Sequence, residues 1–403
     1  MSSATANAAD REALGMNFEF TQEQRAIRDA VDALMRDFPD EYWEEKDREH
    51  AFPWEFYNAF AEAGFLGITI PEAYGGAGLG LIEAMMALGP VAGSGAGLSG
   101  ATPVHINVFG MSPLVKFGSE EMRQRYLPRL VTGDLHVCFG ITEPDAGTDT
   151  TSITTSARRD ADGYVINGHK VWTSKAEQSS HCMLLTRTTP LAECRRKTDG
   201  LTLFMAPMHP DHVTVRPIPK MGRNAVSSCE VWWDNLRVGE EDRIGEEGKG
   251  FKYLLDGLNA ERILVAWQAI QLGKRAIQRA TQYAKDRRVF GRAIGQNQGV
   301  QFPLADSYAK LEAAEVLTMK AAWQYDTDQP CGELANIAKY LGTEAAFEAA
   351  DRAVQTHGGY GYAREYHVER YFREARVWKI APISQNLVLS FVAEKVLGLP
   401  RSF

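Results

Sequence analysis

Six short runs rich in β-branched and aromatic residues follow one another between positions 135 and 238 without a helical spacer. They read VCFGI, YVINGHKVWT, CMLLTRT, LTLFMA, VTVRPI and SCEVWWDNLRV. Residues of these types favour strands, and the dipeptides Asp162-Gly163 and Asn167-Gly168 are typical of hairpin turns. Because successive strands without helical crossovers commonly pair in antiparallel order, the runs predict a compact antiparallel barrel or sandwich.

Helical patterns occupy the chain on both sides of these runs. Thr21 takes the N-cap position of the segment TQEQRAIRDAVDALMRDF, in which apolar residues recur at helical spacing. After the β-region, three long amphipathic segments indicate a four-helix-bundle domain. The sequence therefore predicts an α+β protein that consists of a disordered tail at 1–15, a helical domain at 16–134, a β-domain at 135–243 and a helical bundle domain at 244–403.

The composition argues against several classes of function. The 403 residues carry a formal net charge of -8, and no long run of lysine and arginine offers the basic surface that nucleic acid requires. The five cysteines show no Cys-x-x-Cys spacing, which predicts free thiols. His209 and His212 lie in the loop-like sequence MHPDH, and we predict no metal site. We find no signal peptide and no apolar run that approaches a membrane span, and we expect a cytoplasmic protein.

The stretch 138–176 has the features of a binding site for a flat, aromatic redox cofactor. Small residues, among them Gly140 and Gly147, let a backbone approach a planar ligand closely. Trp172 supplies a ring that can stack, and Ser174 supplies a hydroxyl that can donate a hydrogen bond.

Taken as a pattern, this stretch resembles the signature of the acyl-CoA dehydrogenase family. TEPDAGTD at 142–149 is similar to the family's Thr-Glu-Pro-x-Ala-Gly-Ser/Thr-Asp loop, and NGHKVWTS at 167–174 to its Asn-Gly-x-Lys-x-Trp-x-Thr/Ser segment. In the family both segments hold FAD, and the second covers the flavin ring and reaches its N5 edge. The resemblance implies FAD contacts at Phe139, Ile141, Thr142, Thr148, Trp172 and Ser174, and implies that Thr148 also meets the substrate.

Two further motifs, YAKDRRVFGRAIGQNQGVQF and QTHGGYG, resemble family segments that reach the FAD of a neighbouring subunit. A cofactor shared in this way implies a dimer at least, and the family's usual tetramer is a dimer of such dimers. His357, inside the second motif, reads as a helix-terminus residue without a chemical role. The resemblance implies partner FAD contacts at Arg287, Phe290, Asn297, Gln298, Gln355 and Gly359, and flavin-phosphate contacts at Ser384 and Asn386.

The family's chemistry needs a carboxylate that takes the α-hydrogen of an acyl thioester as a proton, while a hydride passes from the β-carbon to flavin N5. In many members this base is the Glu of a Tyr-Glu-Gly-Thr sequence, but counting forward from Gly359 places Pro382 there. Isovaleryl-CoA and long-chain dehydrogenases carry the base on the long helix after the β-domain instead. The matching residue here is Glu261, whose pKa an apolar pocket would raise by desolvation.

The neighbours of Glu261 allow two interpretations. By resemblance, Arg262 lies beside the substrate arm and Asn259 stands about one helical turn before it. Alternatively, Glu261 and Arg262 are an exposed acidic-basic pair on a helix surface, because Glu-Arg sequences are common there. We expect Glu261 to be the catalytic base, since the flavin motifs align without a gap and predict a missing base at Pro382.

The predicted activity is the FAD-dependent α,β-dehydrogenation of an acyl-CoA thioester to the trans-2-enoyl-CoA, in fatty acid or acyl-CoA catabolism. The family's usual electron acceptor is an electron-transferring flavoprotein. Because Pro382 departs from the common pattern, two other classes remain open. One is a flavoprotein of the same fold with other chemistry, such as a desulfinase or a flavin monooxygenase. The other is a non-catalytic subunit that binds flavin or acyl-CoA. The sequence does not indicate which side chains close the acyl pocket.

Overall fold

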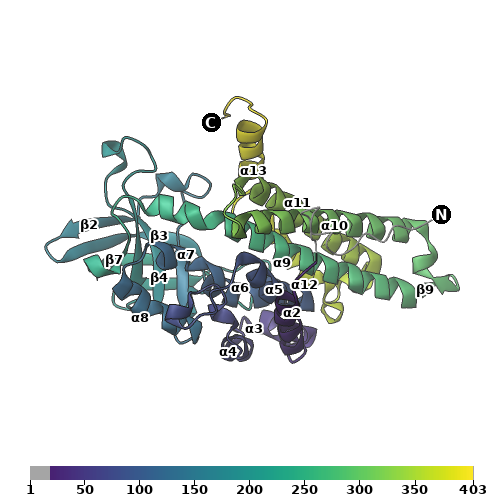
Figure 1. Ribbon diagram of the computed structural model, residues 1–403. Coiled ribbons are helices and arrows are strands. Elements are labelled where there is room, and N and C mark those ends of the chain that lie inside the picture. The colour runs from purple at the N-terminus through teal and green to yellow at the C-terminus, as the bar shows by residue number, and fades with distance from the viewer. Residues whose placement is uncertain (1–18, 403) are drawn as a thin grey trace, which may run out of the picture.

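The structure is a computed structural model that describes residues 19–402, and the predicted disordered tail at 1–15 lies outside the described residues. A β-sheet lies at one end of an elongated molecule, and a bundle of long helices extends from it to the other end (Figure 1). The amino-terminal helices lie along one side of this arrangement (Figure 1). The order of helices, strands and helices is the order predicted from the sequence.

The first described helix, α2, begins where the cap at Thr21 predicts. The hydroxyl of Thr21 accepts a hydrogen bond from the backbone N–H of Gln24 at 3.1 Å. The side-chain oxygen of Gln24 accepts a hydrogen bond from the backbone N–H of Thr21, so the two residues form a capping box. Trp43, Phe56 and Phe60 are fully enclosed in the core of this part. The helices are α2 (Gln22–Met35), α3 (Asp40–Glu49), α4 (Trp54–Glu62), α5 (Leu81–Val91), α6 (Gly97–His105), α7 (Ser112–Phe117) and α8 (Glu120–Val131).

The β-domain is one mixed sheet of eight strands in the order β6-β7-β3-β2-β4-β5-β8, with β1 paired to β4. Most neighbours are antiparallel, as predicted, but β4 runs parallel to β1 and β2. The strands are β1 (Val137–Gly140), β2 (Ser156–Asp160), β3 (Gly163–Ser174), β4 (His181–Arg187), β5 (Leu201–Pro207), β6 (Val213–Pro217), β7 (Ser228–Val238) and β8 (Arg243–Ile244).

One of the two predicted hairpin turns is present. Asp162 and Gly163 connect β2 to β3, whose residues pair in antiparallel order. The turn predicted at Asn167-Gly168 is wrong, because β3 continues through this dipeptide with only a register shift against β7. Pairing with β7 on both sides of the dipeptide outweighs its local turn preference.

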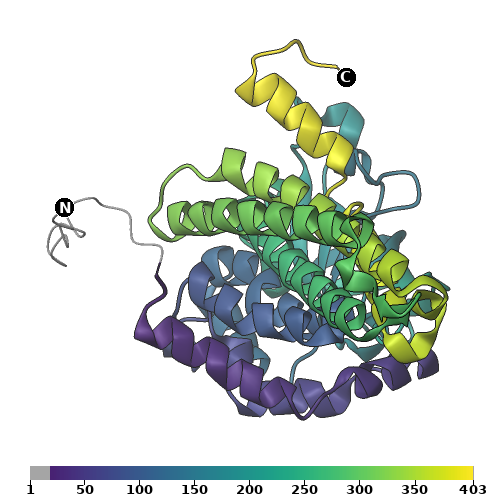
Figure 2. The ribbon, with the colours of Figure 1, turned by 90° about the vertical axis from the view of Figure 1, so that its right-hand side faces the viewer.

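Four helices form the carboxy-terminal bundle: α9 (Gly250–Asp286), α10 (Gln298–Asp326), α11 (Gly332–His357) and α12 (Val368–Trp378). With 37 residues, α9 joins the three parts of the chain. Leu254 packs in the core beside the sheet, Leu264 against the amino-terminal helices, and Ile270 inside the bundle. A hairpin of β9 (Arg288–Val289) and β10 (Arg292–Ala293) lies at the far end of the bundle, and α13 (Gln385–Phe391) projects from its side (Figures 1 and 2).

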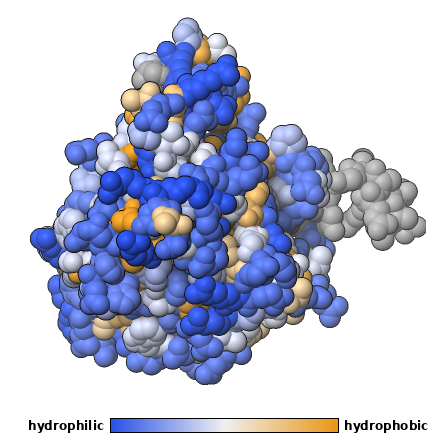
Figure 3. Space-filling model, turned by 90° about the vertical axis from the view of Figure 1, so that its left-hand side faces the viewer, coloured by the Kyte–Doolittle hydropathy of each residue, from blue (hydrophilic) through white to orange (hydrophobic). Residues whose placement is uncertain are grey.

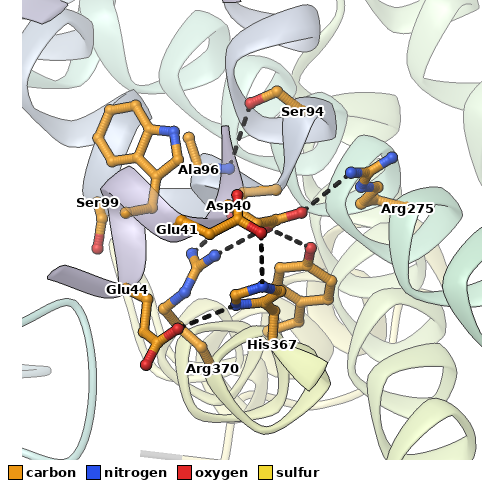
Figure 4. Close-up of polar contacts among 12 residues, drawn as sticks. Asp40, Glu41, Glu44, Ser94, Ala96, Ser99, Arg275, His367 and Arg370 are labelled. Carbon is orange, nitrogen blue, oxygen red and sulfur yellow. Dashed lines mark hydrogen bonds and ion pairs between the residues drawn. The ribbon is translucent and has the colours of Figure 1, made fainter. Parts of the chain in front are cut away.

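Asp40, the first residue of α3, ties the amino-terminal helices to the bundle (Figure 4). Its buried carboxylate accepts hydrogen bonds from Arg370 at 2.9 Å, from the Tyr371 hydroxyl at 2.6 Å and from Arg275 at 3.0 Å, and it also pairs with Arg279. Burial raises the pKa of Asp40, but these cations and the tyrosine more than offset it and hold the pKa at about 2. The interface between the two parts is therefore ionic at neutral pH.

The face of the molecule over the sheet is mostly hydrophilic, with hydrophobic residues scattered over it (Figure 3). By length and composition alone, the helical run 81–117 could cross a membrane, contrary to the expectation that no run approaches a span. However, 72% of its most apolar window is buried inside the protein, as in the core helix of many folds. The run is also interrupted at Gly95 and Gly97, whose φ angles are 110° and 56°.

Candidate active site

A cavity of about 380 Å³ lies where the sheet, α6 and α9 meet, and the end of α12 and the segment before α13 close one side of it. A more open hollow of about 650 Å³ beside Asp40 contains none of the predicted site residues. The smaller cavity is therefore the candidate active site. Six predicted residues line it: Phe139, Ile141, Thr142, Trp172, Ser174 and Glu261.

A buried lysine holds the β-domain wall of this cavity in place. Lys170 of β3 donates to the carbonyl of Ile141 at 2.9 Å and to Oε1 of Glu143 at 3.0 Å. These bonds fix the loop after β1 beside the end of β3. Trp172, which is 57% exposed, lines the cavity together with Thr142. A planar ligand could stack on the Trp172 ring and receive hydrogen bonds from the wall.

Thr148 is exposed and does not line the cavity, although Gly147 and Thr150 on either side of it do. A Cβ added at Gly147 would meet no atom within 4 Å. The loop therefore leaves open space at the cavity rim. The structure places Thr148 at this rim, where the resemblance expects a phosphate and the substrate.

Glu261 contributes a carboxylate to the α9 wall of the cavity. Among the described residues that line the cavity, it is the only acidic one. Protein atoms surround the carboxylate, and this desolvation raises its pKa to about 7, with Arg262 opposing the rise in part. The alternative of an exposed surface pair does not apply, because both side chains are at least half-buried. A carboxylate with this pKa can accept a proton near neutral pH.

Asn259 and Arg262 do not line the cavity with Glu261. Successive helical residues are rotated by roughly 100°, so Arg262 lies on a different face of α9 from Glu261. The Arg262 guanidinium donates to Oδ1 of Asn259 at 2.9 Å, and the pair lies near the start of α11. Asn259 and Arg262, which the resemblance places near the substrate, are thus brought together beside the cavity rather than in its wall.

Arg223 is a cavity residue that the sequence analysis missed. Its guanidinium donates to Oγ of Ser174 at 3.0 Å and also to the Ser228 hydroxyl. Desolvation lowers its pKa to about 10, so it still carries a positive charge at neutral pH. The negative charge of Glu374 opposes this lowering of the pKa in part. The only available sequence signal is an arginine in a loop just before a strand, which has no specificity.

The residues predicted to reach a partner's cofactor gather at the opposite end of the molecule, around the β9–β10 hairpin (Figure 1). Phe290, at the hairpin turn, is 100% exposed. The guanidinium of Arg287 lies 5.5 Å from the ring centroid of Tyr360, which brings the two motifs together. Asn297 directly precedes α10 and accepts a hydrogen bond from Arg292, and Gln298 is the first residue of α10. Gln355 lies in the last turn of α11, and Gly359 follows that helix.

His357 ends α11, where its Nδ1 lies 2.8 Å from the carbonyl of Ala353 and its ring stacks on Tyr283. The expectation that it is a helix-terminus residue is confirmed. Pro382 precedes α13 by three residues, and Ser384 caps the helix by accepting a hydrogen bond from the N–H of Leu387. Asn386 is exposed in the first turn of α13.

The donor set fits a flavin. Trp172 offers an open ring, Thr142 and Ser174 offer hydroxyls, and Arg223 offers a cation at the same wall. Nε1 of Trp378, which also lines the cavity, is a buried donor without a partner among the described residues. A planar ligand with several acceptor atoms would satisfy these groups.

Three comparisons with known proteins agree on one family. The family models for the acyl-CoA dehydrogenase N-terminal, middle and C-terminal domains match residues 21–134, 138–236 and 248–397. The chain is 36% identical to "Acyl-CoA dehydrogenase fadE12" of Mycobacterium bovis, with 96% of this chain and 99% of that protein covered.

Solved structures give the same result. Butyryl-CoA dehydrogenase from Megasphaera elsdenii superimposes with a TM-score of 0.88 at 28% identity and covers 95% of this chain and 100% of its own. An FAD complex of PigA superimposes with a TM-score of 0.88 at 25% identity, with coverages of 95% and 100%.

Proposed function

This chain belongs to the acyl-CoA dehydrogenase family of FAD-dependent oxidoreductases, and we therefore propose that it oxidises a saturated acyl-CoA thioester to the trans-2-enoyl-CoA. One observation carries the proposal. Glu261 is the only carboxylate in the described wall of the cavity, and its pKa of about 7 suits a proton acceptor at neutral pH.

The roles of the cavity residues follow from their positions. Glu261 takes the α-proton, and its burial keeps water from competing for that proton. Phe139, Ile141, Thr142 and Trp172 would hold a flavin ring against the sheet, and Lys170 fixes the loop that carries Ile141. When bound, FAD accepts the hydride from the β-carbon. Ser174 receives a hydrogen bond from Arg223, so its own proton is free to point into the cavity.

A complete site requires two subunits in this proposal. Twenty-six residues of chain separate Glu261 from Arg287, which along a helix corresponds to roughly 39 Å. One FAD molecule cannot reach both Glu261 and Arg287 of the same chain. We propose that Arg287, Phe290 and the end of α11 complete the site of a partner in a homodimer, within a dimer of dimers. The five cysteines are unpaired, which supports a reducing compartment such as the cytoplasm. We expect an electron-transferring flavoprotein to reoxidise the enzyme.

The test is an anaerobic titration of the purified holoenzyme with a panel of saturated acyl-CoAs, followed by flavin absorbance. We expect bleaching in the wild type. Glu261→Gln should keep its FAD and fold but lose roughly two to four orders of magnitude in the rate of flavin reduction, because the shape remains and the base is lost. The exposed Glu62→Gln is the matched control and should behave as the wild type.

Two outcomes would overturn the proposal. If no thioester bleaches the flavin, the chain is a desulfinase, a monooxygenase or a non-catalytic binding subunit. If Glu261→Gln bleaches at the wild-type rate, the base is another group.

A further inference from the structure

The cavity deepens along α9 from Glu261 toward Gln268. Glu261, Val265 and Gln268 are spaced by four and three residues, so they lie on one face of the helix, and all three line the cavity. Val265 is 7% exposed and Gln268 only 1%, whereas the residues before Glu261 include the half-buried Leu258. Gln268 lies roughly 10 Å beyond Glu261 along the helix axis. An acyl chain whose α-carbon meets Glu261 can extend toward this end.

The inner end of the cavity is polar. Nε2 of Gln268 lies 3.0 Å from Nδ1 of His105 on α6, so one hydrogen bond closes the gap between the two helices. Burial lowers the pKa of His105 to about 4, so the ring is neutral at physiological pH. Its Nδ1 therefore accepts a hydrogen bond from the amide N–H of Gln268. Thr102, one turn before His105 on the same helix, also lines the cavity.

This end keeps unused hydrogen-bonding capacity. A glutamine amide has two N–H donors and an oxygen acceptor, and the bond to His105 uses one donor. Among the described residues, the Thr102 hydroxyl has no hydrogen-bond partner, and Gln268 has only His105. A methyl end of an acyl chain would leave these buried groups unpaired, and such a loss disfavours binding of that ligand.

The polar end is also uncharged. Thr102, His105 and Gln268 are all neutral. Among the described residues of the cavity wall, Arg223 is the one cation, and it is bonded to Ser174 and Ser228 of the β-domain. A carboxylate placed among neutral groups would be buried without a counter-charge, which is costly. A neutral hydroxyl or carbonyl group on the acyl chain avoids this cost, and it can form hydrogen bonds with Thr102 and Gln268.

We propose that the preferred substrates are acyl-CoA thioesters whose acyl group carries a neutral hydroxyl or carbonyl remote from the thioester, with Thr102 and Gln268 as specificity-determining residues. This rests on the dehydrogenase function proposed above. An enzyme specific for unsubstituted fatty acyl-CoA thioesters would not prefer this class of substrate.

The test compares matched thioesters in a series of increasing chain length, each made with a terminal methyl, hydroxyl, ketone or carboxylate. Thr102→Val and Gln268→Met keep the side-chain volume and remove hydrogen-bonding groups. At the best-fitting length, the wild type should prefer the hydroxyl or ketone form over the methyl form by at least about tenfold in kcat/KM. In the double variant this ratio should fall below one. Leu98→Met, an apolar change in the same wall, should leave the ratio unchanged.

The outcomes separate the two proposals. Equal or better turnover of methyl-ended thioesters by the wild type overturns the substrate assignment and leaves the dehydrogenase function intact. A preference for the carboxylate form also overturns it. If the double variant still prefers the hydroxyl form, Thr102 and Gln268 are not the cause of that preference. The wild-type ratio decides the substrate class even if the double variant fails to fold. Failure of every thioester to bleach the flavin overturns the function itself, and this inference with it.

Discussion

Glu261 of α9 and Pro382, which precedes α13, line the same cavity. In the resemblance to the family, Pro382 stands where many members carry the base, and a proline cannot accept a proton. Glu261 supplies a carboxylate to the same space from a different helix. The cavity wall therefore contains a carboxylate from α9, although the segment that carries the base in many family members has a proline at that position.

The first prediction concerns the pH dependence of flavin reduction. Because desolvation raises the pKa of Glu261 to about 7, a large part of the carboxyl is protonated below that pH and cannot act as a base. The rate of flavin reduction by a saturated acyl-CoA should therefore rise about tenfold per pH unit on the acid side and level off above pH 7. Stopped-flow absorbance across this range measures it. A rate that stays flat down to pH 5 would exclude Glu261 as the titrating group.

The same raised pKa has a consequence for stability. The folded protein holds the Glu261 proton at pH values where the unfolded chain, with a pKa near 4.5, has released it. The free energy of unfolding should thus fall as pH rises from about 4.5 to about 7. Glu261→Gln should be more stable than the wild type at pH 8, by roughly 2–3 kcal/mol at most. Urea denaturation of both proteins at pH 5 and pH 8 tests this prediction. If the free energies of unfolding of Glu261→Gln and the wild type differ by the same amount at both pH values, the prediction is contradicted.

Much of the fold could be predicted because local patterns decide it. The cap at Thr21 and the long amphipathic segments of α9, α10 and α11 appear where the sequence places them. The predicted family, its three-part fold and its dependence on FAD are confirmed. Helix α6 was not predicted, since GLSGATPVH contains glycine and proline, which disfavour helices. Its residues 97–104 are buried, and this packing outweighs the poor propensity.

The candidate site was predictable only in part. Glu261 and the β3 residues follow from motifs, but Arg223 does not, because its place depends on strand register: β7 pairs Ser228 with Ser174 of β3 and so brings the preceding loop beside the cavity. The resemblance places Arg262 beside the substrate arm, and in the structure Arg262 does not line the cavity. Adjacent residues of a helix point in different directions, so Glu261 and Arg262 do not share one wall.

The second prediction concerns the ionic interface in Figure 4. Asp40→Asn would leave the buried guanidinium of Arg370 without its counter-charge, and the free energy of unfolding should fall by about 3–5 kcal/mol. Because its pKa of about 2 lies below the ordinary value, the stability that Asp40 provides is present above pH 4 and is lost as pH falls toward 2. Urea denaturation measures both effects. Asp29→Asn, which removes an exposed partner of Arg28, is the control and should change stability by less than about 1 kcal/mol.

The third prediction concerns Arg223. A cation one hydrogen bond away through Ser174 favours the negative charge that a flavin gains with a hydride. Arg223→Gln should therefore make the bound flavin harder to reduce. We expect the equilibrium constant for flavin reduction to fall at least tenfold, which corresponds to a reduction potential lower by about 30 mV for a two-electron couple. Dye-coupled reductive titration measures the potential, with the exposed loop variant Arg195→Gln as control. An unchanged potential in Arg223→Gln would leave Arg223 with a purely structural role.

The last prediction concerns Phe290, whose side chain is fully exposed at the end of the bundle. If it covers a partner's cofactor, as the family resemblance implies, each subunit of the dimer buries one such ring at the other's site. Burial of a phenylalanine contributes roughly 1.5–3 kcal/mol, so Phe290→Ser should weaken dimerisation by roughly one to two orders of magnitude per ring and release FAD on dilution. Analytical ultracentrifugation and the flavin-to-protein absorbance ratio measure the two effects together. Leu191→Ser, at an exposed leucine of the β-domain, is the matched control and should change neither. A Phe290→Ser protein that remains a fully loaded oligomer at the same dilution would show that Phe290 does not contribute to the partner's cofactor site.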